Sequence, residues 1–155
     1  MDLTTIIIAI VGLSIFIIPV ILDQRSKKKR STGIEKEFLR LAKNQHLKIT
    51  YYDVWRNSRA IGIDKTSGKI FFFKKEDGND QKVLIDLAQV KKCSISKTSR
   101  GRKNSTDQVS LIFTFSKSEK PEKRLAFYHK GQDQTMQNEM ELAEKWLSII
   151  NLKLL

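Results

Sequence analysis

Two hydrophobic patterns divide the chain. Residues 3–22 are almost uniformly apolar and carry no charge, whereas later segments alternate apolar and polar positions. A helix rises about 1.5 Å per residue, so this segment would be roughly 30 Å long, the thickness of a bilayer's hydrocarbon core. The pattern predicts one transmembrane helix. An acidic start at Asp2 and the lack of a small-residue cleavage pattern disfavour a cleaved signal peptide.

The charges beside this segment predict its orientation. Basic residues follow only its C-terminal end, and these are Arg25, Lys27, Lys28, Lys29 and Arg30. The positive-inside rule then places the N-terminus outside and the remaining chain in the cytoplasm. The sequence therefore predicts a single-pass protein of the bacterial inner membrane, with these five residues in contact with the anionic inner leaflet.

The apolar period changes after residue 33. Apolar residues at helical spacing predict an amphipathic helix over residues 34–47, which could pack on its own domain, lie in the bilayer interface or pair with another chain. We expect the helix to pack on its own domain. Short β-rich runs separated by turn residues then predict seven strands: 48–55, 59–64, 69–75, 82–87, 90–96, 108–116 and 124–129. A second amphipathic pattern predicts a C-terminal helix over residues 135–152, starting at a cap from Asp133 or Thr135.

Three stretches resemble the pleckstrin-homology-like superfold. They are AIGIDKTSGKIFFF (60–73), VLIDLAQVKKC (83–93) and ELAEKWLSIIN (141–151). Over residues 48–152 the resemblance implies a mainly β, α+β domain: a seven-stranded antiparallel barrel capped by the C-terminal helix, with Trp146 as the helix anchor. The whole chain resembles an uncharacterised family of single-pass bacterial membrane proteins. Its expected divisions are an anchor (1–24), a basic juxtamembrane segment with an amphipathic helix (25–47) and the barrel domain (48–155).

Net charge leaves several partners open. The chain has 29 basic and 17 acidic residues; five basic and two acidic ones precede residue 31, so the remainder holds 24 and 15, a net charge of +9. Such a domain could meet nucleic acid, an anionic surface or an acidic protein. The most basic loop follows the fifth predicted strand and is either a solvated loop or a candidate interaction loop. Its basic residues are Lys97, Arg100, Arg102 and Lys103.

Residues with catalytic potential are few. The two histidines, His46 and His129, are far apart in sequence, and Cys93 is the single cysteine. No nucleophile, phosphate-loop or metal-ligand motif occurs, so we expect no enzyme, cofactor or metal site. Asp64 and Asp86, which follow apolar runs, are expected to form turns.

The aromatic residues of the predicted strands have two interpretations. Tyr51, Tyr52, Trp55 and residues 71–73 could stack on nucleic-acid bases, but the hydrophobic core is the simpler expectation. In the strand of residues 69–75, Phe71 and Phe73 share one face and Phe72 takes the other.

The predicted function is a membrane-tethered, non-catalytic interaction or regulatory module that recruits a protein partner or touches the inner membrane surface. The alternative is a membrane-held basic domain that binds nucleic acid, which the charge alone supports. Homo-oligomerisation is left open.

Overall fold

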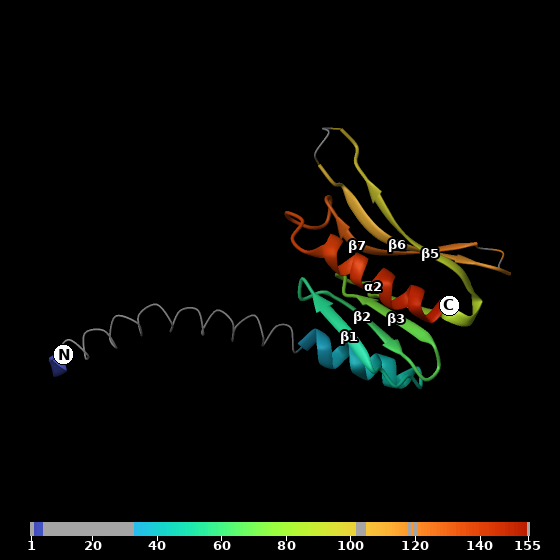
Figure 1. Ribbon diagram of the computed structural model, residues 1–155, viewed down its shortest axis with the longest axis horizontal. Coiled ribbons are helices and arrows are strands. Elements are labelled where there is room, and N and C mark those ends of the chain that lie inside the picture. The colour runs from blue at the N-terminus through green and yellow to red at the C-terminus, as the bar shows by residue number, and fades with distance from the viewer. Residues whose placement is uncertain (1, 5–32, 102–104, 118, 120, 155) are drawn as a thin grey trace.

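The computed structural model describes residues 2–4, 33–101, 105–117, 119 and 121–154 (Figure 1). A helix over residues 33–44 precedes seven strands and a C-terminal helix. The elements are β1 (Tyr51–Trp55), β2 (Arg59–Asp64), β3 (Lys69–Lys74), β4 (Gln81–Asp86), the 3-10 turn η1 (Leu87–Gln89), β5 (Val90–Thr98), β6 (Gln108–Phe115), β7 (Glu122–His129) and α2 (Glu139–Leu154). All seven predicted strands are therefore present, with ends shifted by a few residues.

The strands form two antiparallel sheets. The first has the order β1-β2-β3-β4 and the second the order β5-β6-β7, so every neighbour in a sheet is also a neighbour in sequence. The chain turns from β1 to β2 through Arg56 and Asn57, both at positive φ, and from β2 to β3 through Gly68 at φ 66°. Short hairpins of this kind bring sequential strands together.

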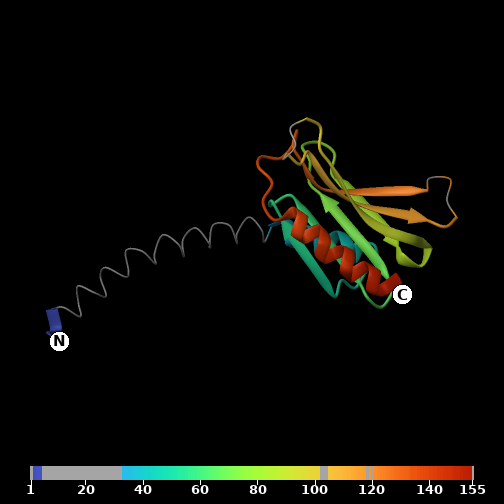
Figure 2. The same ribbon diagram turned by 45° about the horizontal axis from the view of Figure 1, so that its top comes forward.

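The prediction of a closed barrel is wrong. Within the described residues no backbone ladder joins the first sheet to the second, so both sheets are open. The turn η1 between β4 and β5, capped by the Asp86 side chain, directs the chain away from the first sheet. Helix α2 lies between the two sheets, where direct pairing would have closed the barrel (Figures 1 and 2). The sheets are joined by side chains instead, as in the 3.1 Å hydrogen bond from Trp55 Nε1 to the Phe127 carbonyl.

The main hydrophobic core fills the space between the sheets and α2. It includes Phe72, Leu111, Phe127 and the fully buried Trp146. The indole Nε1 of Trp146 donates a 2.9 Å hydrogen bond to the carboxylate of Asp53 on β1. A buried tryptophan needs such an acceptor, and here the acceptor attaches α2 to the first sheet.

A second core lies on the opposite face of the first sheet. The helix of residues 33–44 packs there through Phe38, whose ring stacks on Phe71 at 5.4 Å between centroids. The helix thus packs on its own domain, and Phe71 and Phe73 lie beneath it while Phe72 enters the main core, as the alternation predicted. Gly62 permits the close approach, because a Cβ there would come within 2.8 Å of the Phe38 ring.

The C-terminal helix begins later than expected. Its first residue is Glu139 rather than Thr135, and the first helical hydrogen bond runs from Leu142 N to the Asn138 carbonyl. The expected caps have other partners: the Thr135 carbonyl accepts a 2.6 Å hydrogen bond from Arg56, and Asp133 pairs with Arg59. Residues 130–138 therefore form a connection that begins with a turn closed onto the His129 carbonyl, called here the β7–α2 loop.

The predicted transmembrane helix is not among the described elements. Except for residues 3 and 4, segment 3–22 lies outside the described residues, as do Arg25 and residues 27–30 with their predicted membrane-surface contacts. In the described ranges no helix is long and apolar enough to cross a membrane. Helix α2 has 16 residues, fewer than the roughly 20 that a span requires, and the helix of residues 33–44 is charged on one side. The transmembrane fold class, single-pass character and inner-membrane location are therefore corrected for the part of the chain that the structure describes.

Candidate functional site

The outer face of the second sheet, directed away from α2, is the candidate site. Alternate residues of a strand point to opposite faces, so Leu111 and Phe113 enter the core while Ser110 and Ile112 point outward. The register places short polar side chains side by side on this face, which we call the outer face. Its members are Lys92, Ser94, Ser96, Thr98, Gln108, Ser110, Ile112, Thr114, Glu122, Arg124, Ala126 and His129.

No described helix covers the outer face. Helix α2 packs against β5, β6 and β7 from the core side (Figure 2). Apart from Ile112 and Ala126 the side chains of this face are polar or charged, so the face can remain in water without helical cover. Ser110 is 1% exposed and its hydroxyl accepts a 3.2 Å hydrogen bond from Gln108 Nε2. The hydroxyls available to a bound chain are those of the half-buried Ser94 and Ser96 and the exposed Thr98.

A cavity of about 520 Å³ lies at one end of the outer face, where β5 and β7 end and β6 begins. We call it the basic cavity. It is lined by Thr98, Arg100, Asp107, Gln108, Arg124, His129, Lys130 and Gly131. Three of these side chains are cations and one is a carboxylate, so the cavity is positively charged.

The single carboxylate of the basic cavity is already engaged. Asp107 accepts a hydrogen bond from the backbone N–H of Arg100 and lies 3.6 Å from Lys130 Nζ. The side chains of Lys130 and Arg124 are 60% and 56% exposed, and Arg124 reaches Glu122 only at 3.8 Å. Exposed pairs of this kind contribute about 0–1 kcal/mol, so both cations can exchange their partners for a ligand.

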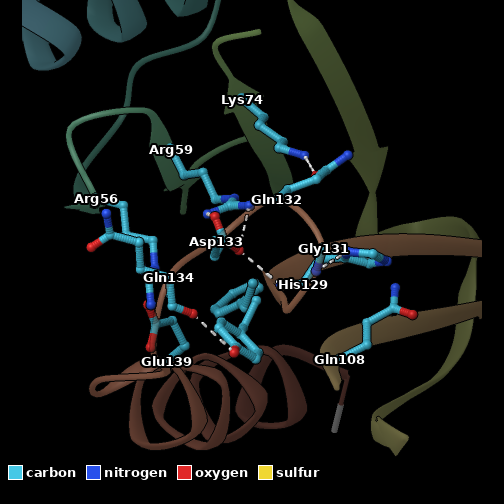
Figure 3. Close-up of polar contacts among 12 residues, drawn as sticks. Arg56, Arg59, Lys74, Gln108, His129, Gly131, Gln132, Asp133, Gln134 and Glu139 are labelled. Atoms are coloured by element: carbon cyan, nitrogen blue, oxygen red, sulfur yellow. Dashed lines mark hydrogen bonds and ion pairs between the residues drawn. The ribbon is translucent and has the colours of Figure 1, made fainter. Parts of the chain in front are cut away.

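The β7–α2 loop forms one wall of the basic cavity and is held from behind by buried charges (Figure 3). Asp133 receives two 2.9 Å hydrogen bonds from Arg59 and one of 2.8 Å from the His129 N–H. Burial raises the pKa of the Asp133 carboxyl, but the hydrogen bonds from Arg59 and His129 and the charges of Arg59 and Arg56 outweigh it. The pKa therefore lies below its ordinary value, and Asp133 is ionised at neutral pH.

Further bonds fix the two ends of this loop. His129 Nδ1 accepts a 3.1 Å hydrogen bond from the Gly131 N–H. At the α2 end, Arg56 pairs with the buried Glu139 and lies over the Tyr128 ring, 5.5 Å from its centroid. The loop therefore presents Lys130 from a fixed backbone.

The sequence-predicted site residues are only partly brought together. Arg100 lines the basic cavity. Lys97 is an exposed residue of β5, but it is paired with the core residue Val109 and so lies on the opposite face of the sheet from Thr98. Arg102 and Lys103 lie outside the described residues. Trp146, the predicted helix anchor, is fully buried in the main core.

Three residues that line the basic cavity were not predicted from the sequence: Arg124, His129 and Lys130. They belong to β7 and the loop after it, and they reach the cavity because β7 pairs with β6 so that His129 faces Gln108. The basic run of the β5–β6 loop was the only signal visible in the sequence. Arg124, His129 and Lys130 reach the cavity through the pairing register of β6 and β7, and this register cannot be read from the sequence.

Metal and nucleophile chemistry have no support in the described residues. Among them, no group of three or more His, Cys, Asp or Glu side chains could hold a metal ion. Cys93 is buried, and this burial raises the pKa of its thiol to about 12, which leaves it protonated and unreactive. Asp64 accepts hydrogen bonds from the N–H groups of Lys48, Thr66 and Ser67, and these lower its pKa. It forms a turn, as expected.

Comparisons with known proteins place the chain in no family. The sequence matches no protein-family model and no curated protein, and the structure matches no solved structure.

Proposed function

We propose that this domain is a non-catalytic interaction module that binds an acidic segment of a partner protein on its outer face. The observation that carries the proposal is the basic cavity, in which three cations stand at the end of an uncovered polar sheet face and the one carboxylate is occupied. Such a cavity attracts negative charge and speeds the encounter with it.

The side chains of the face fit an extended acidic chain. Arg124 can form a bidentate pair with a carboxylate, which is stronger and more directional than a contact with a point charge. Lys130 and Arg100 can receive neighbouring carboxylates in the cavity. The hydroxyls of Ser94 and Ser96 can hydrogen-bond to backbone groups of the partner.

The aromatic residues favour protein over single-stranded nucleic acid as the ligand. Binding of single strands relies on aromatic side chains on which bases stack. Among the described Phe, Tyr and Trp residues, only Tyr51 is exposed, at 37%, and its ring packs against Trp146 on the side of β1 and α2. Phe71, Phe72 and Phe73 are buried. The outer face therefore offers charge without a stacking platform.

Membership of the pleckstrin-homology-like superfold is part of this proposal. The element order of seven strands followed by a helix agrees with it. The superfold alone would not identify a function, since one fold serves many.

A charge-reversal experiment tests the proposal. The probe is a fluorescein-labelled Glu-rich peptide, and fluorescence anisotropy measures its Kd for the purified protein. The variant Arg124→Glu/Lys130→Glu should weaken binding by about tenfold or more, since loss of two charge-assisted contacts amounts to at least 1.4 kcal/mol.

The matched control is Lys36→Glu/Lys43→Glu on the exposed side of the helix of residues 33–44, which changes the net charge equally. We expect the control to change Kd by no more than about twofold, apart from long-range attraction that salt screens. Equal weakening by both pairs would show unspecific attraction and refute the proposal. Tighter binding to a single-stranded oligonucleotide, with a steep loss on adding salt, would favour the nucleic-acid alternative instead.

A further inference from the structure

A second cavity, of about 400 Å³, lies on the other side of the β7–α2 loop. Three segments distant in sequence form it: the β1–β2 turn, the end of β3 with the residues after it, and the β7–α2 loop (Figure 3). Its lining residues are Ser58, Arg59, Lys74, Lys75, Glu76, Asp77, Gln132 and Asp133. We call it the loop cavity.

Two buried cations stand next to each other in the loop cavity. Arg59 and Lys74 are direct cross-strand partners on β2 and β3, and their side chains are only 1% and 9% exposed. Like charges in directly opposite positions destabilise an antiparallel pair. A buried charge also loses its hydration and requires a partner of opposite sign. Two adjacent buried cations therefore require two anionic partners close by.

Among the described residues that line the loop cavity, one carboxylate is of comparable burial. Asp133, whose side chain is 9% exposed, takes both terminal nitrogens of Arg59. The Nε of Arg59 is buried and has no acceptor. Lys74 Nζ bonds to the neutral Gln132 side chain at 2.5 Å and to Glu76 at 2.6 Å, and the Glu76 side chain is 40% exposed. The buried positive charge of Lys74 is thus balanced by a carboxylate only through Glu76, which is partly exposed to solvent.

We propose that the loop cavity binds an oxyanion, the carboxylate or phosphate group of a small ligand, between Arg59 and Lys74. The oxyanion would accept from Arg59 Nε and would take Lys74 from Gln132, replacing a neutral acceptor with a charged one, which makes a stronger hydrogen bond. Gln132 is exposed and can rotate away rapidly to admit it.

The rim limits which ligands fit. Glu76 and Asp77 stand at the mouth of the cavity and would repel a second anionic group. The volume is that of a small-molecule site rather than of a folded partner. The loop cavity therefore suits a small ligand with one anionic group, and it is separate from the proposed site for an acidic segment on the outer face.

The test observes Arg59 directly. The Nε–H of a buried arginine gives its own signal in a ¹H–¹⁵N correlation spectrum, and the probes are inorganic phosphate and acetate, titrated at constant ionic strength with chloride. We expect a saturable shift of the Arg59 Nε–H signal with at least one probe, and the stronger of the two identifies the oxyanion as phosphate or carboxylate. A signal that stays in place, or moves only linearly with both probes, would overturn the proposal.

Two variants and a control complete the test. Lys74→Met should weaken the saturable binding at least tenfold, whereas Lys36→Met, which removes the same charge at an exposed residue outside the loop cavity, should change it by no more than twofold. Gln132→Glu places a competing carboxylate beside Lys74 at an exposed position, so it should also weaken binding about tenfold even if Lys74→Met folds poorly. Unchanged affinity in Gln132→Glu would overturn the proposed position of the oxyanion.

Discussion

Replacing Asp133 with alanine should be among the most destabilising single changes in this domain. The substitution leaves Arg59, 1% exposed, without its carboxylate and beside the buried Lys74. Breaking a buried ion pair by removing one partner costs about 3–5 kcal/mol, because the other charge stays buried and uncompensated. The hydrogen bond that Asp133 accepts from the His129 N–H is lost as well, at about 1 kcal/mol.

The expected loss is large compared with the total stability. A domain of this size has a free energy of unfolding of about 5–15 kcal/mol, so the loss of about 4–6 kcal/mol in Asp133→Ala should be roughly a quarter of the total or more. Equilibrium unfolding in urea, followed by tryptophan fluorescence, would measure the change from the midpoint and the slope. The exposed Asp77, which lines the same loop cavity, provides the control: Asp77→Ala should change stability by no more than about 0.5 kcal/mol.

A double substitution separates the charge from the shape. Arg59→Met/Asp133→Leu removes both charges and keeps an apolar filling, so it should recover most of the stability that Asp133→Ala loses. The His129 N–H would still lack its acceptor, which leaves a deficit of about 1 kcal/mol. A loss below about 1 kcal/mol for Asp133→Ala, or a double variant as unstable as the single one, would refute the claim that a buried charge pair holds this loop.

The remaining predictions concern the second core, the thiol and the response to acid. Gly62→Ala should destabilise the fold by about 1–3 kcal/mol in urea unfolding, because its Cβ would overlap the Phe38 ring; no change would mean that the helix of residues 33–44 yields without loss. Cys93, with a pKa of about 12, should react with a thiol-specific reagent only as fast as the protein opens, and a rapid reaction in the native state would contradict its burial. Asp64 and Asp133 have lowered pKa values in the folded protein, so their contribution to stability is present above about pH 4 and is lost as the pH falls through their folded pKa values. Asp64→Asn should therefore flatten the loss of stability in acid, and an unchanged acid limb would argue against this role for Asp64.

The sequence predicted the elements of the fold better than their assembly. Alternation along residues 69–74 correctly separated Phe72 from Phe71 and Phe73, because side-chain direction in a strand is a local property. Whether two sheets close into a barrel is not a local property, because it depends on contacts between residues that are distant in sequence. It depends on whether β1 and β4 meet the second sheet, and here helix α2 lies between the sheets instead.

The candidate site was predicted in part for the same reason. Arg100 was visible as a member of a basic loop, but the charge on the other side of the cavity comes from Arg124 and Lys130 through strand register. Asp133 was expected to cap the C-terminal helix, a local role. Its actual partner, Arg59, is 74 residues away in sequence, and no short-range pattern indicates such a pair.

The most direct test of the proposed function maps the Glu-rich peptide onto the protein by ¹H–¹⁵N chemical-shift perturbation at physiological salt. We predict that the largest shifts fall on the backbone amides of Arg100, Arg124, Lys130 and Gly131, around the basic cavity, and continue along Ser94 and Ser96 on the outer face. Shifts confined to the helix of residues 33–44, or spread evenly over all exposed lysines, would contradict a binding site on this sheet.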